Sequence, residues 1–294
     1  MNSANIGTPK AEVTITPNLV QQLLKTQFPN FAAFPIRFLG NGWDNTMYQL
    51  GKDYLIRLPR RQMAAQLIKN EQNWLPQIAT QLPINIPVPI KAGRPQTNYP
   101  WHWSIIPWFY GQTADLVSLN MQHAIQIGQF LKALHILAPS NLPENTARGV
   151  PLIEKAQAAK ERFVRLQLKT DLVTKKIEHL WQQALETNLP KVDYLLHGDL
   201  HPRNILANKQ AITAIIDWGD ITSGDAATDL ACLWMLFEEE KFRQQALEIY
   251  QPSSDLLARA KGWAVYFGSI LLDTGLVDHP QHAKIGAATL TQLM

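Results

Sequence analysis

Two aspartates and an asparagine stand close together in the sequence, with a spacing that suits phosphoryl transfer. Asp199 lies five residues before Asn204, and Asp217 follows Asn204 by thirteen residues, at the end of the next apolar segment. In such a set, one carboxylate accepts or orients a hydroxyl proton. The other carboxylate and the amide oxygen can hold Mg²⁺, which prefers hard oxygen ligands and stabilises phosphate charge. The spacing predicts a phosphotransferase with Asp199 as the catalytic base and Asn204 and Asp217 as metal ligands.

The same stretch allows a second chemistry, because His197, Asp199 and His201 occupy alternate positions. A His-x-Asp-x-His run can ligate zinc, and a zinc site of this kind would indicate a metal hydrolase. No further cluster of histidines or cysteines in the sequence completes such a site. Phosphoryl transfer is therefore the main prediction, and a zinc hydrolase is the first alternative.

The composition is typical of a soluble globular protein. Of the 294 residues, 46% are hydrophobic and 17% are charged, a composition too apolar for a disordered chain. The length suits one large domain or two lobes with a sizeable core. The single cysteine, Cys232, cannot form an internal disulfide and fits a reducing compartment. The N-terminus lacks a secretory signal pattern, and no apolar run reaches the roughly 20 residues of a membrane helix. We expect a cytoplasmic protein that does not contact a membrane.

The charge is distributed unevenly along the chain. Residues 1–110 hold ten Lys and Arg against four Asp and Glu, a balance of +6, whereas residues 111–294 hold seventeen against twenty, a balance of −3. A basic first part suits a polyanion such as a nucleoside triphosphate, and a mildly acidic second part suits a metal and a cationic substrate. Chance asymmetry on two solvated surfaces explains the split equally well. The basic residues form no dense stripe interleaved with aromatics, so nucleic-acid binding is not predicted.

An antiparallel meander is predicted in the first part of the chain, with strands at 34–40, 46–50 and 54–58. Its first turn contains Gly42 and Asn45. A glycine-bearing hairpin can lay its backbone N–H groups over phosphates, although most such hairpins are only tight turns.

A basic residue on a strand and an acidic residue on the next helix follow this hairpin, an order that allows them to pair. Arg57 lies near the end of the third strand, and Glu71 lies inside a helix predicted over 63–80. Such residues can form a pair that aims the cation at nucleotide phosphates, whereas the alternative is ordinary surface charge. The next predicted strand, 103–107, leads into a connector that includes Trp108, and the backbone there could contact a purine edge.

The second part of the chain has mainly helical periodicity. His135 is interpreted as a packed structural residue, and Asp229 is predicted to anchor the segment of Asp199 from behind. One helix is expected to end near His135. Further helices are expected at about 153–168, 172–187, 228–239, 239–250, 254–273 and 281–293.

Taken together, residues 36 to 280 resemble the aminoglycoside phosphotransferase family, which has a protein-kinase-like fold. The most specific similarity lies in residues 197–204 (HGDLHPRN) and 216–220 (IDWGD). The turn at 42–45 and the segment 57–61 resemble a bacterial branch of the family that includes macrolide phosphotransferases.

The resemblance implies an α+β, two-lobe fold. A small antiparallel β-rich N-lobe would span 1–107, and a larger, mainly helical C-lobe would span 108–294. The nucleotide would lie between the lobes, and the acceptor would lie against the helices of the C-lobe. The chain would be a monomer or a dimer.

The resemblance also implies roles for individual residues. Asp199 would be the catalytic base, and Asn204 and Asp217 would bind Mg²⁺. Glu71 would pair with Arg57, which would reach the phosphates. The family more often has lysine at the position of Arg57, and arginine places its charge differently. A nucleotide-binding pseudokinase is therefore an alternative.

The implied activity is Mg²⁺-dependent transfer of the γ-phosphate of ATP or GTP to a hydroxyl group of a small molecule. The acceptor would be an aminoglycoside or a macrolide antibiotic. A small-metabolite kinase acting on choline, homoserine or a sugar is the other enzymatic alternative, since the motif does not identify the acceptor.

Overall fold

The computed structural model describes residues 10–294, which separate into two compact units. The first unit contains the described residues up to Thr80, together with 85–110 and 216–219. The second unit contains 81–84, 111–215 and 220–294. The N-terminal residues 1–9, where no secretory signal is predicted, lie outside the described residues. The lobe boundary at 107/108 stays a prediction.

A five-stranded antiparallel sheet forms the centre of the first unit, with the strand order β1-β2-β3-β5-β4. The predicted meander is confirmed, as is the strand at 103–107. The short strand β4 was not predicted. The strands are β1 (Ile36–Asn41), β2 (Asn45–Leu50), β3 (Tyr54–Pro59), β4 (Lys91–Gly93) and β5 (Trp103–Pro107).

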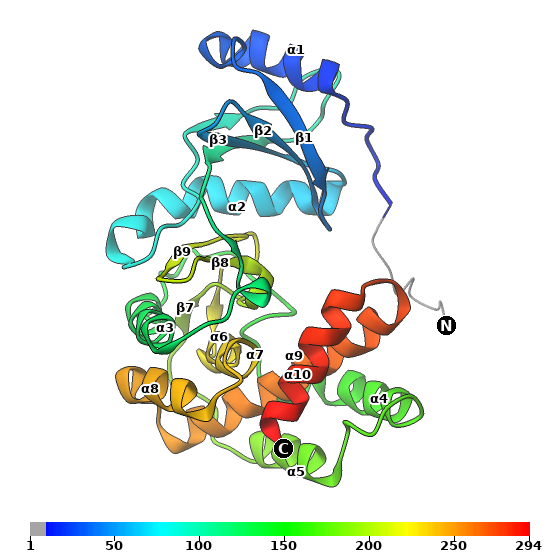
Figure 1. Ribbon diagram of the computed structural model, residues 1–294, viewed down its shortest axis with the longest axis vertical. Helices are drawn as coiled ribbons and strands as arrows, with labels where there is room; N and C mark the ends of the chain where they lie inside the picture. Colours follow the sequence, from blue (N-terminus) through cyan, green and yellow to red (C-terminus); the bar gives the residue numbers. More distant parts are fainter. Residues whose placement is uncertain (1–9) are drawn as a thin grey trace. The chain divides into compact units, whose positions relative to one another are not determined.

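Two helices, α1 (Pro17–Gln27) and α2 (Gln62–Ile78), lie on opposite sides of this sheet (Figure 1). Alternation along β3 explains the arrangement, because successive side chains of a strand point to opposite faces. Ile56 and Leu58 join the apolar core formed with α1, whereas Arg57 between them bonds Glu71 of α2. Arg57 therefore lies on the face of the sheet opposite to the core formed with α1, where it meets Glu71 of α2.

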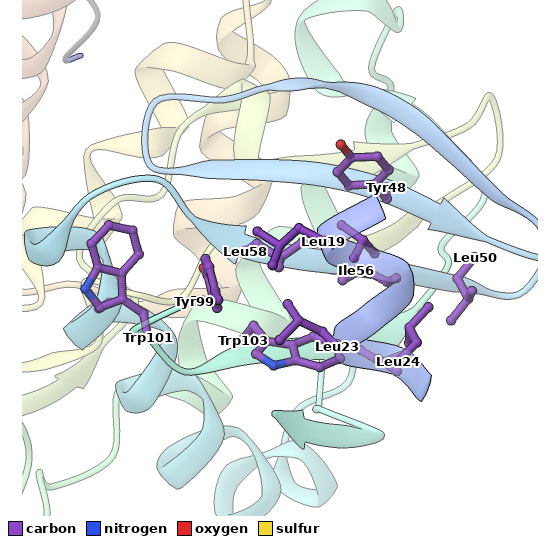
Figure 2. Packing of buried hydrophobic residues seen from close by; sticks show 13 residues of the cluster. Leu19, Leu23, Leu24, Tyr48, Leu50, Ile56, Leu58, Tyr99, Trp101 and Trp103 are labelled. Atoms are coloured by element: carbon purple, nitrogen blue, oxygen red, sulfur yellow. The ribbon is translucent and has the colours of Figure 1, made fainter. Parts of the chain in front are cut away.

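The apolar layer is a continuous core. Leu19, Leu23 and Leu24 of α1 belong to one buried cluster with Ile56 of β3 and Trp103 of β5 (Figure 2). All five are at least nine-tenths buried, and each such side chain contributes about 1.5 to 3 kcal/mol of hydrophobic free energy. This core fixes the position of β3 and hence of Arg57.

The second unit is mainly helical. Its longest helix, α9, packs against α10 and also against α4, α5 and α6 (Figure 1). Most of the predicted helices are confirmed, although the segment expected as one helix at 228–239 forms two short helices. The α-helices of this unit are α3 (Met121–Leu134), α4 (Ala156–Gln167), α5 (Lys175–Leu185), α6 (Ala227–Leu230), α7 (Cys232–Leu236), α8 (Glu240–Tyr250), α9 (Ser254–Asp278) and α10 (Pro280–Leu293).

Two small antiparallel sheets carry the segment of Asp199 and Asn204. One pairs β7 (Tyr194–Leu196) with β10 (Thr222–Gly224). The other has the order β6-β8-β9, formed by Gln112–Thr113, Ile205–Ala207 and Ile212–Ile215. The predicted α+β class, with an antiparallel sheet first and a helical part after it, is confirmed.

Candidate active site

Asp199 lies just after β7, in a turn that requires glycine. Gly198 has a φ of +87°, a conformation that side-chain-bearing residues rarely adopt. A Cβ at this position would lie 2.5 Å from the backbone oxygen of Asp220. The turn therefore depends on Gly198 both for its backbone conformation and for close packing.

Asp229 holds this turn from behind, as the sequence predicted. Its fully buried carboxylate accepts hydrogen bonds from the backbone N–H groups of His197 at 2.6 Å and Gly198 at 2.9 Å. His135 Nε2 lies 3.5 Å from the same carboxylate, and His135 Nδ1 lies 2.7 Å from the Tyr250 hydroxyl. The packed, structural interpretation of His135 fits these contacts.

The carboxylate of Asp199 is held by three side chains. Arg148 Nη2 donates to Oδ1 at 2.7 Å, and His201 Nε2 lies 3.5 Å from Oδ2. Asn204 Nδ2 lies 3.3 Å from Oδ2 and donates to the Asp199 carbonyl at 2.9 Å. Burial alone would raise the pKa of Asp199, but Arg148 and the neighbouring histidines hold this pKa well below its usual value. Asp199 is thus an ionised acceptor at neutral pH.

The amide of Asn204 also has a defined orientation. Asn204 lies in the short 3₁₀ turn η5 (Pro202–Asn204), and its amide nitrogen donates a hydrogen bond to the Asp199 carbonyl. Its carbonyl oxygen Oδ1 is therefore the atom that a hard cation would bind. The structure brings together Asp199 and Asn204, two of the predicted site residues.

Arg148 was not predicted from the sequence. It lies between the expected helix that ends near His135 and the one expected at about 153–168, and it is separated from Asp199 by 51 residues. No local motif indicates this pairing, because the contact exists only once the loop packs against β7 and β10.

The predicted zinc alternative gains no support from the geometry. The His197 ring uses Nδ1 to accept the backbone N–H of Asp199 at 3.2 Å. Among residues 10–294, no group of three or more His, Cys, Asp or Glu side chains is placed to hold a metal ion.

A second set of predicted residues meets in the first unit. Arg57 Nη1 bonds both carboxylate oxygens of Glu71 at 2.7 Å, and Arg57 Nη2 bonds Asp217 Oδ1 at 2.7 Å. Glu71 also accepts the backbone N–H of Trp218 at 2.8 Å. Burial opposes the charge of Arg57, but the two carboxylates raise its pKa above the usual value. The predicted pairing of Arg57 with Glu71 is present, and Asp217 joins it.

Asp217 has a left-handed backbone, with a φ of +64°. This conformation is uncommon for a residue with a side chain and costs of order 1 to 3 kcal/mol. Its side chain is 49% exposed, and Arg57 binds Oδ1. The other carboxylate oxygen, Oδ2, is thereby the more available one for a cation.

The turn between β1 and β2 is tied down by arginines. The N–H of Gly42 donates to the backbone oxygen of Asn45 at 2.8 Å, so this N–H closes the turn. Arg60 donates to the Gly42 carbonyl at 2.9 Å, and Arg61 pairs with Asp44. Burial raises the pKa of Asp44, although Arg61 opposes the effect. The phosphate-binding role of Gly42 stays a prediction, with its own N–H already used.

The two other residues predicted to contact the nucleotide, Asn45 and Trp108, differ in whether their polar groups already have hydrogen-bond partners. Asn45 is the first residue of β2, and its buried Oδ1 has no hydrogen-bond partner within the described part of the chain. Trp108 follows β5, and its backbone N–H donates to the Asp53 carbonyl at 2.8 Å. A purine contact at Trp108 would therefore have to use another backbone group.

A cavity of about 600 Å³ lies in the second unit. Pro202, three residues after Asp199, contributes to its wall. The lining is both aromatic and acidic, because Trp234, Phe237 and Phe242 lie there with three carboxylates and one lysine. The charged lining residues are Asp115, Glu238, Glu239 and Lys284. Such a volume and mixture suit a small organic ligand.

Two stacked histidines near this region bind Arg203. The rings of His279 and His282 lie 3.8 Å apart between centroids at an interplanar angle of 11°. Arg203 Nη1 lies 3.1 Å from His279 Nε2 and 2.9 Å from His282 Nε2. Burial, followed by His279, Arg203 and His201, lowers the pKa of His282 to about 4.

This lowered pKa predicts a loss of stability in mild acid. As pH falls below the ordinary histidine value of 6.5, the unfolded chain takes up a proton that folded His282 resists until about pH 4. We expect the free energy of unfolding to fall by about 1 to 2 kcal/mol from this residue between about pH 7 and pH 5, after allowance for partial solvent screening. Urea unfolding at the two pH values measures it.

His282→Gln should reduce that pH dependence. His179→Gln, at an exposed histidine of α5, should leave it as in the wild type. An unchanged pH slope in His282→Gln would contradict the assignment.

No helix in the described part of the chain is long and apolar enough to cross a membrane.

Comparison with known families gives one extensive match. The model of a family described as "Phosphotransferase enzyme family" matches residues 35–263, more than half of the chain. A curated relative, the uncharacterized protein YcbJ of Bacillus subtilis (strain 168), is 26% identical over 143 residues. That match covers 46% of each sequence, so the chain spans about half the length of this relative.

Solved structures with the same fold include proteins that act on antibiotics. The GDP complex of wild-type aminoglycoside 2'-phosphotransferase-IIIa has a TM-score of 0.70 and 19% identity, covering 95% of this chain and 98% of that one. The macrolide 2'-phosphotransferase MphH of Brachybacterium faecium has a TM-score of 0.61 and 19% identity, covering 93% and 97%. The streptomycin–ATP complex of APH(2")-IIa has a TM-score of 0.61 and 20% identity, covering 88% and 90%. These similarities confirm the predicted kinase-like fold.

Proposed function

The chain belongs to the phosphotransferase enzyme family, and from this premise we propose that it transfers the γ-phosphate of ATP or GTP to a hydroxyl group of a small basic molecule. The observation that carries the proposal is the ionised carboxylate of Asp199, with Arg148 at 2.7 Å and the amide of Asn204 at 3.3 Å. A fixed anionic acceptor is what in-line attack by a hydroxyl group requires. Asp199 would orient the hydroxyl and accept its proton.

The donor set suits a magnesium ion. We assign Mg²⁺ to Asn204 and Asp217 on the sequence motif, since an amide oxygen and a carboxylate are hard ligands. The amide nitrogen of Asn204 donates to Asp199, so its Oδ1 is the atom that can bind a cation. Arg57 pairs with Oδ1 of Asp217, so Oδ2 of that carboxylate is the more available oxygen. A bound Mg²⁺ would neutralise phosphate charge during the transfer.

The nucleotide would be bound by the first unit. Arg57 is the cation assigned to the phosphates, and Glu71 holds it with both carboxylate oxygens at 2.7 Å. Gly42, Asn45 and the backbone near Trp108 complete the proposed donor site. The GDP and ATP in structurally similar phosphotransferases support a nucleotide donor.

The cavity beside Pro202 is the proposed acceptor pocket. Its aromatic side chains suit an apolar ring system, and the excess of carboxylates over lysine suits a protonated amine. This mixture favours an amphiphilic basic alcohol of the size of an antibiotic. The kanamycin and streptomycin bound by similar structures are basic molecules with many hydroxyl groups.

A phosphorylation screen tests this function. Purified protein with Mg²⁺ and either ATP or GTP would be incubated with aminoglycosides, macrolides, choline, homoserine and sugars, and products detected by mass spectrometry. We expect a phosphate adduct with a basic antibiotic. Adducts with only choline, homoserine or a sugar would overturn the acceptor class, and the absence of any adduct would overturn the activity.

A regulatory pseudokinase is the second candidate, favoured by one observation. Arg57 replaces the more usual lysine and already uses its guanidinium on Glu71 and Asp217. Tight binding of nucleotide without consumption across the whole panel would support this reading over the enzyme. The cytoplasmic location and the monomeric or dimeric state stay predictions.

A further inference from the structure

The cation bound to Asp199 comes from outside the segment that contains Asp199 and Asn204. We propose that Arg148 is a positioning residue that fixes the Asp199 carboxylate for attack by the acceptor hydroxyl. This inference rests on the proposed function. It assigns to a loop residue a part in phosphoryl transfer that the sequence motif does not contain.

The backbone before Arg148 is held by a local turn. Asn145 Oδ1 accepts the N–H groups of Ala147 at 2.8 Å and Arg148 at 3.1 Å. Asn145 Nδ2 donates to Asp220 Oδ1 at 2.8 Å. Asp220 also packs against Gly198, so the turn of Arg148 is joined to the turn of Asp199.

The backbone after Arg148 is held just as firmly. Gly149 has a φ of +70°, and a Cβ there would lie 2.9 Å from both Leu196 Cδ1 of β7 and Ser223 O of β10. The Gly149 carbonyl accepts the N–H of Asp225 at 2.9 Å. The loop is therefore packed onto the same strand pair that carries Asp199 at its end, and the two residues have a fixed register.

The side chain of Arg148 has little freedom. Its guanidinium carbon lies 5.0 Å from the ring centroid of Phe267 on α9, and its Nη2 donates to Asp199 Oδ1 at 2.7 Å. Its buried Nε has no hydrogen-bond partner within the described part of the chain. A buried donor without a partner costs free energy, and packing alone would not offset that cost. The ion pair with Asp199 explains why a charged side chain lies here.

The bond to Arg148 makes the two carboxylate oxygens of Asp199 unequal. Oδ1 makes the short bond to Arg148, while the contacts of Oδ2 with His201 and Asn204 are longer, at 3.5 and 3.3 Å. Arg148 thus prevents rotation of the carboxylate and leaves Oδ2 as the oxygen that receives the hydroxyl proton. As the oxygen of the acceptor forms its bond to phosphorus, its proton passes to Oδ2 and the nucleoside diphosphate leaves with the electrons of the broken bond.

The test compares Arg148→Ala and Arg148→Lys with a matched arginine of α4. Arg165 makes the same kind of ion pair, at 2.7 Å to buried Asp273, away from Asp199. For Arg148→Ala we expect kcat to fall about tenfold to a hundredfold with the nucleotide KM within about twofold, because misplacing one reacting group costs rate and not binding. Arg148→Lys should recover part of kcat, and added methylguanidinium should raise kcat of Arg148→Ala. Arg165→Ala should show neither the kcat loss nor the rescue.

A double variant separates positioning from general loss of structure. Arg148→Ala should add no further loss in an Asp199→Asn background, because the group it positions is gone. Equal kcat in Arg148→Ala and wild type, or equal losses in Arg148→Ala and Arg165→Ala, would overturn the inference and leave the proposed function standing. If Arg148→Ala fails to fold, a wild-type kcat in Arg148→Lys would overturn it. A wild type that transfers no phosphate would overturn the proposed function, and the inference with it.

Discussion

Replacing Asp199 with alanine is expected to lower kcat for phosphoryl transfer by about 10³-fold or more, while the affinity for nucleotide stays within about threefold. The carboxylate is the proposed acceptor of the hydroxyl proton, and general-base contributions of this kind are typically about 10² to 10⁴-fold. The carboxylate accepts hydrogen bonds from the side chains of Arg148 and Asn204. Steady-state kinetics with either nucleotide give kcat, and titration calorimetry gives the nucleotide affinity.

The matched control is an exposed carboxylate near the same strand. Asp193→Asn changes a residue just before β7 and should leave kcat within about twofold. Asp199→Ala should also unfold cooperatively, as the wild type does. Transfer at more than about a tenth of the wild-type rate in a folded Asp199→Ala protein would remove Asp199 from its assigned role.

Replacing Glu71 with alanine is expected to lower the free energy of unfolding by about 3 kcal/mol. Glu71 is 1% exposed and Arg57 is 7% exposed, so the change leaves a buried guanidinium without its main partner. Breaking a buried pair in this way costs about 3 to 5 kcal/mol, and the remaining bond to Asp217 places the effect at the lower end. The nucleotide affinity should fall about tenfold or more, because Arg57 loses its fixed orientation. Urea unfolding and titration calorimetry measure the two effects.

Lys69→Ala supplies the control for this helix. Lys69 is exposed on α2, and its replacement should change the free energy of unfolding by less than about 0.5 kcal/mol. Arg57→Lys keeps the charge but loses the two-nitrogen fork that bonds Glu71 through Nη1 and Asp217 through Nη2, so it should be intermediate in stability. A Glu71→Ala protein as stable as Lys69→Ala, with unchanged nucleotide affinity, would contradict the role given to this pair.

Local patterns in the sequence predicted much of the structure. The alternation and turn residues of 34–58 gave the meander, since both signals are contained within a few neighbouring residues. The spacing of Asp199 and Asn204 likewise predicted that they belong to one site, and in the structure the Asn204 amide nitrogen lies 2.9 Å from the Asp199 carbonyl. Asp229 could be predicted as an anchor because it lies in a helix that follows soon after the site segment.

Contacts between distant segments could not be predicted in this way. Arg148 lies 51 residues before Asp199, and His282 lies 79 residues after Arg203. Neither belongs to a periodic pattern, because a single charged or aromatic polar residue in a loop or at a helix start has many compatible partners. The acceptor was expected against the helices of the second part of the chain, but the residues that line the proposed acceptor cavity could not be predicted, since its wall combines α7, α10 and the segment 114–119.

The hairpin turn illustrates a further limit of sequence reasoning. A glycine-bearing turn predicts backbone N–H groups that can face a phosphate, but it does not predict which of them the turn uses. In the structure, the N–H of Gly42 donates to Asn45 and the Gly42 carbonyl accepts from Arg60. Which backbone donors remain for a ligand depends on the hydrogen bonds that the folded turn makes, and the residue types alone do not indicate these bonds.

The most direct test of phosphoryl transfer is a ³¹P NMR time course of wild-type protein and Asp199→Ala with Mg²⁺, nucleotide and the best acceptor of the screen. For the wild type, we expect a phosphomonoester signal that grows in step with the loss of the γ-phosphate signal and with the rise of nucleoside diphosphate. Asp199→Ala should show none of these changes over the same period. A wild type that binds nucleotide but forms no phosphomonoester, or that releases only inorganic phosphate, would contradict the account.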